Sequence, residues 1–326
     1  MTNVTYSSSI NKAFQLTGGG DVILTNCNIT GDVTGTYSAS NIWCGDGRNV
    51  TVNGGTYGSI FINASNGAGV LSAGKITVND GTIGKLILEA EKNTADLGLF
   101  GSGDKNLEFN TLYVSTAEEL TAAIAAGKNV TFENDIEIAA TNGGYRVAGI
   151  VVNGITVDGN GYTLTVTGAG GTWDCAIYTT GGTIKNLTVA GAMRGIFTAG
   201  ASADIYIENV DFKNVVYTFN SDGGNKAYGV YLTNCTMNGW TSYSNVHKEV
   251  VFTDCTFTKG SGYAFFRPYN NTVLNNCVFT DGYSVDATRN NITVNDCYYG
   301  ETLITAENAA EIGLFNSVDK LIFDAE

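Results

Sequence analysis

A six-residue motif recurs four times near the end of the chain and constrains the fold more than any other feature. The copies are LTNCTM (232–237), FTDCTF (252–257), LNNCVF (274–279) and VNDCYY (294–299). Each copy, called here the corner motif, contains an apolar residue, a polar residue, Asn or Asp, Cys, any residue and an apolar residue. The four cysteines are 20, 22 and 20 residues apart. A short motif that recurs at such a period is typical of solenoids, so we predict one coil of a parallel β-helix for each copy.

The residue types of the corner motif suit a strand that turns sharply. Alternation places its first, fourth and sixth residues largely on one side of the strand and leaves polar residues on the other. Asn or Asp at the third position tolerates the left-handed backbone conformation that a tight corner needs. Cys at the fourth position is small and readily buried. Since coils stack at about 4.8 Å, equivalent residues should form ladders along the axis.

Composition and charge limit the fold class and the partners. The 326 residues include 42 glycines and 1 proline, which suits short strands joined by tight corners in an all-β chain. No apolar run approaches roughly eighteen residues, so we expect no membrane span. The formal net charge is −14 and there is no cluster of Lys and Arg. We therefore expect no nucleic-acid partner and no anionic membrane.

The seven cysteines favour neither a metal site nor disulfides. The chain has no CxxC pair and only one histidine, so we expect no metal and no cofactor. Stacked cysteines would project in parallel from neighbouring coils, with Cβ atoms about 4.8 Å apart, which is wider than a disulfide allows. We predict reduced, buried thiols.

An end-piece that occurs twice divides the chain into two β-helical units. The sequence DLGLF at 96–100 matches EIGLF at 311–315. We interpret residues 1–112 as a short β-helical unit with a C-terminal end-piece. Residues 113–326 form the second, helix-capped β-helix, and its own end-piece lies at 301–326. Further copies of the corner motif support both units. The first is LTNCNI (24–29), and the looser ones are VNGGTY (52–57), VNDGTI (78–83), IKNLTV (184–189) and IENVDF (207–212).

One short helix is predicted at about 116–126, within STAEELTAAIAAGK (115–128). Thr116 with Glu119 can form a capping box, as can the Ser-Glu pair one residue earlier. Gly127 is placed to end the helix. We expect the helix to cover the open end of the second unit.

The N-terminal end of the first unit lacks a predicted cap. An open β-helix end exposes unpaired backbone and apolar side chains. We expect a protein partner or a neighbouring subunit to cover this end near Ala13–Leu24, and a homo-oligomer is one such arrangement. The segment MTNVTYSSSINKAF has no basic start and no apolar core, so we find no signal peptide in this chain.

The helix, the segment ITVDGNGYTLTV (155–166) and the repeated [IVL]xNCxF coils together resemble the right-handed parallel β-helix, or pectate-lyase-like, superfamily. The resemblance covers residues 113–326 well and residues 13–112 more loosely. It implies a right-handed parallel β-helix, the hand also expected of parallel crossovers. It implies no single function, because the superfamily includes pectate lyases, polygalacturonases, phage tailspikes and non-catalytic surface and virion proteins.

The catalytic patterns of the superfamily's enzymes are incomplete in this chain. A polygalacturonase-like site needs a Gly-His-Gly segment, but His247 has no neighbouring glycine and is expected in a surface loop. A pectate-lyase-like site needs calcium-binding carboxylates and an arginine base. The candidates are Asp286 with Arg289, and Arg267 on the preceding coil, where it would neighbour Asp286. A calcium ion takes about six to eight oxygen ligands, so a surface ion pair fits this set better.

Aromatic residues follow the corners on successive coils. Trp240, Tyr263 and Tyr283 each follow a glycine at equivalent positions. Facing outward, these rings would form a flat ladder for sugar rings or a protein partner; facing inward, they would form an internal stack. We favour the internal or partly buried arrangement for these three and exposure for the remaining candidates. The candidate ligand-binding residues are Trp240, Tyr243, Tyr263, Arg267, Tyr269 and Tyr283.

Two classes of function fit these features. The first is a non-enzymatic structural or adhesive β-helix, with glycan binding as one activity. It would be a phage virion surface component, such as a capsid decoration or fibre, or a bacterial surface adhesin module. Its location would then be the virion or the extracellular cell surface. The alternative is a carbohydrate-active enzyme, a polysaccharide lyase or glycoside hydrolase, that acts on the outer face of the coils with a polysaccharide as substrate.

Overall fold

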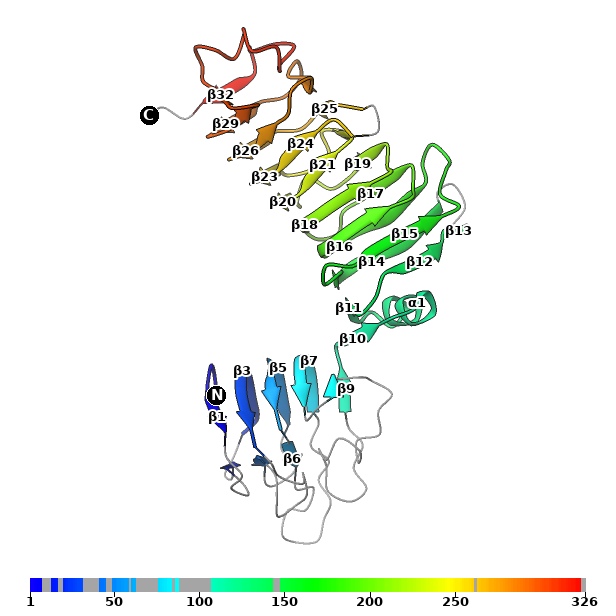
Figure 1. Cartoon of the computed structure of the whole chain (residues 1–326), viewed down its shortest axis with the longest axis vertical. Coiled ribbons are helices and arrows are strands. Elements are labelled where there is room, and N and C mark those ends of the chain that lie inside the picture. Colours follow the sequence, from blue (N-terminus) through cyan, green and yellow to red (C-terminus); the bar gives the residue numbers. More distant parts are fainter. Residues whose placement is uncertain are drawn as a thin grey trace. The chain divides into compact units, whose positions relative to one another are not determined.

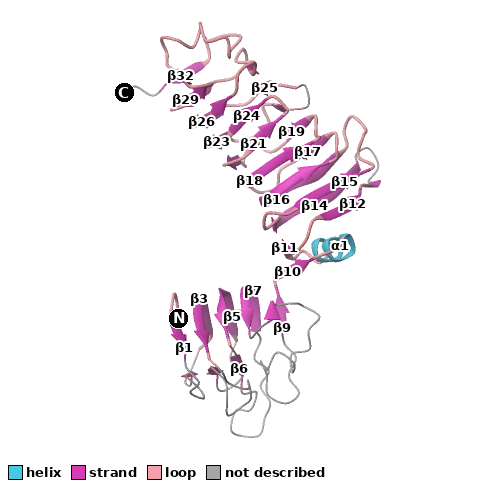
Figure 2. Cartoon of the chain, in the orientation of Figure 1, coloured by secondary structure: helices cyan, strands magenta, loops and turns pink. Residues whose placement is uncertain are grey.

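The computed structural model describes residues 1–7, 13–16, 20–31, 41–44, 49–58, 60–62, 76–83, 86–87, 107–142, 147–260 and 263–323. Within these residues, parallel strands stack as a β-solenoid of about 10 turns with a single helix (Figure 1, Figure 2). The predicted all-β parallel β-helix is therefore confirmed. Contacts divide the chain into two compact units, Met1–Tyr113 and Val114–Glu326.

The first unit contains two parallel sheets. One sheet consists of β1 (Thr5–Ser7), β3 (Val22–Thr30), β5 (Val50–Tyr57), β7 (Ile76–Ile83) and β9 (Leu107–Phe109), with β8 (Leu86–Ile87) antiparallel to β7. The other consists of β2 (Phe14–Leu16), β4 (Ile42–Cys44) and β6 (Ile60–Ile62). Leu24, Val52 and Val78 are paired in register and buried, so they form one apolar ladder of the core. The first copy of the end-piece, at 96–100, lies outside the described residues.

Three series of parallel-paired strands run along the second unit (Figure 1). The first series is β11 (Asn129–Phe132), β14 (Val147–Asp158), β16 (Cys175–Ala190), β18 (Ile205–Lys213), β20 (Val230–Thr233), β23 (Val250–Thr253), β26 (Thr272–Asn275), β29 (Ile292–Asn295) and β32 (Leu321–Phe323). The second series joins β12 (Ile136–Ala139) and β15 (Thr163–Thr167) through the later halves of β16 and β18 to β21 (Thr236–Asn238), β24 (Thr256–Thr258), β27 (Val278–Phe279) and β30 (Tyr298–Tyr299).

The third series begins at the first halves of β14 and β16, where Ala148 pairs with Cys175. It continues through β17 (Arg194–Ala199), β19 (Tyr217–Gly223), β22 (Trp240–Tyr243), β25 (Phe265–Pro268) and β28 (Ser284–Val285). The remaining strands are β10 (Thr111–Val114), β13 (Thr141–Asn142), which is antiparallel to β14, and β31 (Thr302–Leu303), which is antiparallel to β30.

The helix α1 (Ala117–Ala125) has both predicted ends. The Thr116 hydroxyl accepts a hydrogen bond from the Glu119 backbone N–H at 3.2 Å, and the Glu119 carboxylate accepts one from the Thr116 N–H at 3.2 Å. At the other end, Gly127 has a φ of 66° and its N–H donates to the carbonyl of Ile124. The buried face of α1 packs on β11, β12 and β14, so the helix covers the first coil of the second unit.

The corner motif has the predicted backbone conformation. Its third residues have φ values from 48° to 54° at Asn26, Asn186, Asn209, Asn234, Asp254, Asn276 and Asp296. A glycine, Gly54, with a φ of 79°, takes this place in β5. In β7 the positive φ belongs to Gly81 rather than to Asp80, where it was expected, and the pairing of β5 with β7 shifts in register at the same corner, after Val52.

The cysteine ladder consists of reduced thiols, as predicted. All seven cysteines are free and buried. In Cys235, Cys255, Cys277 and Cys297, each Sγ donates to the carbonyl two residues earlier at 3.2–3.4 Å. A carbonyl of the preceding coil lies 3.4–3.6 Å away from each of them. The thiols therefore fill the inner corner and satisfy local carbonyls.

Phenylalanine rings form the core of the last coils. The rings of Phe257 and Phe279 stack with centroids 4.5 Å apart, and Phe252 and Phe266 contact Phe257 at 5.2 and 5.1 Å. Burial of such a side chain contributes roughly 1.5–3 kcal/mol. The C-terminal end-piece closes the stack, because β32 pairs with β29 and Phe315 forms a bridge to Val285. Among the described residues, no helix has the length and hydropathy that a membrane crossing would need.

Candidate functional site

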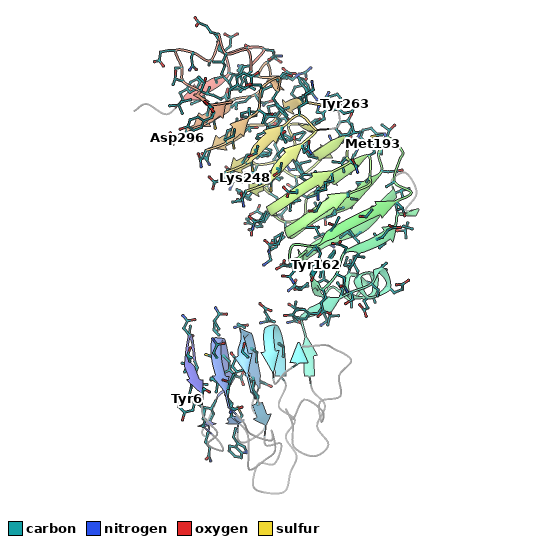
Figure 3. The ribbon with its side chains drawn as sticks, viewed as in Figure 1. Tyr6, Tyr162, Met193, Lys248, Tyr263 and Asp296 are labelled. Carbon is teal, nitrogen blue, oxygen red and sulfur yellow. The ribbon has the colours of Figure 1, made fainter. Side chains whose placement is uncertain are left out.

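Aromatic and arginine side chains gather along the third series of strands. Register places Arg194 beside Tyr217, and Tyr217 beside Trp240, on consecutive coils. Tyr263 lies at the margin of the second unit away from Lys248 (Figure 3). We call the set the aromatic–arginine row: Trp173, Arg194, Tyr217, Trp240, Tyr263, Arg267, Tyr269 and Arg289.

Contacts between consecutive members make the row continuous. The Arg194 guanidinium carbon lies 4.5 Å from the ring centroid of Trp173 and 4.4 Å from that of Tyr217. The rings of Tyr217 and Trp240 stack with centroids 5.0 Å apart and planes inclined by 23°. Trp240 and Tyr263 stack at 6.2 Å and 21°. The stacked rings follow the coil spacing of about 4.8 Å.

Two further arginines extend the row toward the C-terminal coils. The Arg267 guanidinium carbon lies 5.6 Å from the Trp240 centroid and 5.3 Å from the Tyr269 centroid. Arg289 lies 4.3 Å from the same Tyr269 ring. Tyr269 is therefore close to two cations, at distances at which a guanidinium is attracted to a ring face.

Stacking decides which surfaces the rings offer to a ligand. Nearly parallel rings with centroids 5.0 Å apart must overlap face to face, because coplanar rings would be farther apart. Tyr217 and Trp240 therefore show mainly their edges, unlike the flat ladder considered from the sequence. Tyr263 is the last ring of this stack and is 42% exposed, so it offers ring surface to a ligand.

Two of the candidate ligand-binding residues lie in the core, as favoured for Tyr283 but not for Tyr243. Tyr283 is 1% exposed, and its hydroxyl donates to the carbonyl of Gly239 at 3.0 Å. Phe265 pairs with Ser284, so Tyr283 is displaced by one residue from the register of Tyr263 and points to the opposite face. The interpretation of Trp240, Tyr263 and Tyr283 as equivalent is therefore wrong for Tyr283.

The predicted exposure of Tyr243 is also wrong. This residue is 1% exposed, and its hydroxyl lies 2.8 Å from Thr272 Oγ1. Burial raises the pKa of the Tyr243 hydroxyl well above its usual value. Tyr243 is three positions after Trp240, so alternation turns the two side chains to opposite faces of β22. Arg267 and Tyr269 are half-buried.

The Asp286 carboxylate is hydrogen-bonded to the C-terminal end-piece and to nearby hydroxyl groups, rather than paired with Arg267 as expected. The carboxylate accepts hydrogen bonds from the Tyr269 hydroxyl at 2.8 Å, the Thr288 hydroxyl at 2.6 Å and the Asn316 amide at 3.1 Å. Burial acts to raise the pKa of Asp286, but the hydrogen bonds from Thr288, Asn316 and Tyr269 outweigh it and lower the pKa to about 2. Arg267 donates instead to Ser242 Oγ at 3.0 Å, so the expected ion pair is replaced by neutral partners.

His247 is buried, and its prediction as a surface-loop residue is wrong. It is 2% exposed, with Nε2 2.9 Å from Ser221 Oγ, and its backbone N–H donates to Asn270 Oδ1 at 3.2 Å. Its Nδ1 has no hydrogen-bond partner among the described residues. Burial lowers the pKa of His247 to about 4. The imidazole is therefore neutral at physiological pH.

A buried polar chain lies beneath the row. Arg194 donates to Asn220 Oδ1, and Asn220 Nδ2 donates to the Ser242 carbonyl at 2.7 Å. Arg267 donates to the Ser242 hydroxyl, so the chain links both guanidinium groups. Arg194 and Tyr217 were not among the residues predicted from the sequence. Strand register would have identified them, since both share a rung position with Trp240.

Neither a metal site within the described residues nor a match to a known family accompanies the row. No group of three or more His, Cys, Asp or Glu side chains within the described ranges could hold a metal ion. No protein-family model matches the chain, and no match was found among the curated proteins or among the solved structures. The resemblance to the pectate-lyase-like superfamily therefore rests on the repeat pattern and the solenoid fold alone.

Proposed function

We propose that the chain is a non-enzymatic, adhesive β-solenoid that binds a glycan at the aromatic–arginine row. The observation that carries the proposal is the stack of Tyr217, Trp240 and Tyr263, which ends in the partly exposed ring of Tyr263. A tyrosine supported on one face by another ring is a rigid, amphipathic anchor of low conformational entropy. Its remaining surface suits the apolar face of a sugar ring.

Unpaired donors in the same row support a ligand with acceptor groups. Trp240 Nε1 and Arg267 Nε are buried and have no hydrogen-bond partner in the described part of the chain. An unmade hydrogen bond of this kind costs about 1–3 kcal/mol. A small movement of either side chain toward a bound hydroxyl or carbonyl oxygen would recover part of that free energy.

The surroundings of Asp286 favour binding over catalysis. A glycoside hydrolase commonly uses a pair of carboxyl groups, one of which must donate a proton. The low pKa of Asp286 makes it a poor proton donor near neutral pH. Its oxygens are also occupied by Tyr269, Thr288 and Asn316. A carbohydrate-active enzyme therefore has less support than an adhesive protein.

The biological setting that we propose is a surface, either of a phage virion or of a bacterial cell. The stacked parallel coils of each unit present side chains at regular intervals, which suits attachment to an extended polymer. The acidic chain, with a net charge of −14, would remain well solvated in such a setting.

Substitution of the exposed ring tests the proposal. Tyr263→Ala should weaken binding to a recognised polysaccharide about tenfold or more, since stacked aromatic anchors contribute about 1–3 kcal/mol at binding sites. The matched control is Tyr298→Ala, because Tyr298 is 36% exposed but lies outside the row. Affinity electrophoresis in gels that contain each polysaccharide would measure both variants. Equal loss in the two variants would contradict the assignment to the row.

A further inference from the structure

A polar groove crosses the corners of three consecutive coils, away from the aromatic–arginine row. It has a volume of about 380 Å³ and is lined by Asn160, Gly161, Asn186, Leu187, Thr188, Asn209 and Asp211. That volume lies in the range of small-molecule sites, roughly 300–1,000 Å³. The lining residues come from the loop after β14 and from the corners within β16 and β18.

Amide side chains are fixed in orientation along one side of the groove. Asn186 Nδ2 donates to Asp158 Oδ1 at 3.0 Å, and Asn209 Nδ2 donates to Asn186 Oδ1 at 2.9 Å. Asn234 continues the ladder by donating to Asn209 at 2.7 Å. Asn186 and Asn209 each use one N–H and one oxygen lone pair in the ladder, so a second N–H and a second lone pair remain on each of these two amides.

The other side of the groove carries polar groups that have no side-chain partner among the described residues. Thr188 and Asp211 are paired in register on neighbouring coils. Neither the Thr188 hydroxyl nor the Asp211 carboxylate forms a hydrogen bond or an ion pair with another described residue. Leu187, which is 2% exposed, adds an apolar floor. The lining contains no Lys, Arg or His.

We propose that this groove binds one unit of a neutral glycan through adjacent hydroxyl groups. The Asp211 carboxylate can accept hydrogen bonds from two neighbouring hydroxyls, and charge-assisted hydrogen bonds of this kind are the strong ones. The fixed amides supply both donors and acceptors for the remaining hydroxyls. An anionic sugar is disfavoured by Asp211 and by the net charge of −14. The inference shares its ligand class with the proposed function but does not depend on the aromatic–arginine row.

The test uses the full chain and matched ligands. Dextran, mannan, galactomannan and a linear β-glucan would each be tested as native polymer and after periodate oxidation with borohydride reduction, which opens vicinal diols. Affinity electrophoresis would compare the wild type with Asp211→Asn and with the control Asp222→Asn. The control removes the same charge at an exposed position outside the groove. Thermal melting would verify that all variants are folded.

The expected result is binding of at least one native neutral polysaccharide, with about a tenfold loss in Asp211→Asn and none in Asp222→Asn. Opening of the vicinal diols should remove the effect of Asp211. Unchanged binding by Asp211→Asn, or no binding of any of the four native polysaccharides by the wild type, would overturn the inference. If Tyr263→Ala loses binding while Asp211→Asn keeps it, the proposed function stands and the groove assignment fails. The reverse pattern supports the groove and contradicts the role of the row.

Discussion

At the scale of single residues, the corner asparagines combine two roles. Asn276 has a φ of 50°, and its amide donates to Asp254 of the preceding coil at 2.6 Å. The left-handed conformation costs an ordinary L-residue about 1–2 kcal/mol, and Asn tolerates it better than most. The same side chain therefore sets the corner and joins it to its neighbour.

Two substitutions at Asn276 separate these roles. Asn276→Ala loses both the conformational tolerance and the hydrogen bond, whereas Asn276→Gly loses only the hydrogen bond. We expect the alanine variant to be less stable than the glycine variant by about 1 kcal/mol. Urea unfolding followed by circular dichroism would measure the difference. A glycine variant that is the less stable of the two would contradict the role of the positive φ.

His247 should make the second unit sensitive to mild acid. Its pKa falls from 6.5 to about 4 because of burial, so the folded state binds the proton less well than the unfolded state. The contribution of neutral His247 to the free energy of unfolding is fully present above about pH 6.5 and is lost as the pH falls toward 4. The loss amounts to about 3 kcal/mol. In His247→Gln, the free energy of unfolding should change less between pH 6.5 and 4 than in the wild type, and equal slopes would contradict this account.

At the scale of strands and corners, the sequence predicted local backbone features better than it predicted the face of a strand on which a side chain lies. The capping box of Thr116 and Glu119 and the corner conformation of Asn234 depend on neighbours in the sequence, and both are present. The faces of Tyr243, expected to be exposed, and of Tyr263, expected to be internal or partly buried, were mispredicted because facing depends on the register between coils of unequal length. A slip of one residue between β25 and β28 places Tyr263 outside and Tyr283 inside.

The C-terminal end-piece should detach more easily when Asp286 is changed. The Asp286 carboxylate accepts from Asn316 of the end-piece and from Tyr269 of the preceding coil. Asp286→Asn should lower stability by about 1–2 kcal/mol and increase amide exchange at Leu314–Asn316. The control is Asp281→Asn, which removes an exposed carboxylate shortly before β28. Because the pKa is lowered, this contribution is present above about pH 4 and is lost as the pH falls through about 2.

At the scale of the whole molecule, the ends of a solenoid govern its association. Among the described strands, β1 pairs only with β3, and Tyr6 on β1 is 36% exposed and contacts Phe14. An edge of this kind can add a strand from a neighbouring protein or subunit. We propose that a neighbouring protein or subunit associates at β1, which precedes the Ala13–Leu24 segment where the open end was predicted from the sequence.

A charged residue on the edge strand tests this association. Tyr6→Lys should shift the chain toward monomer in sedimentation experiments, because a lysine on an edge opposes strand addition. Val318→Lys, at a residue of the second unit that is 40% exposed, is the control. Equal association of both variants and the wild type would contradict a docking role for β1.

The central claim, binding without cleavage at the aromatic–arginine row, is tested most directly by one combined assay. The chain would be incubated with acidic and neutral polysaccharides, and bound sugar and new reducing or unsaturated ends would be measured in the same tubes. We predict bound polysaccharide that depends on Tyr263, with no new ends. New ends that disappear in Asp286→Ala, with the fold intact, would contradict the account and establish a carbohydrate-active enzyme.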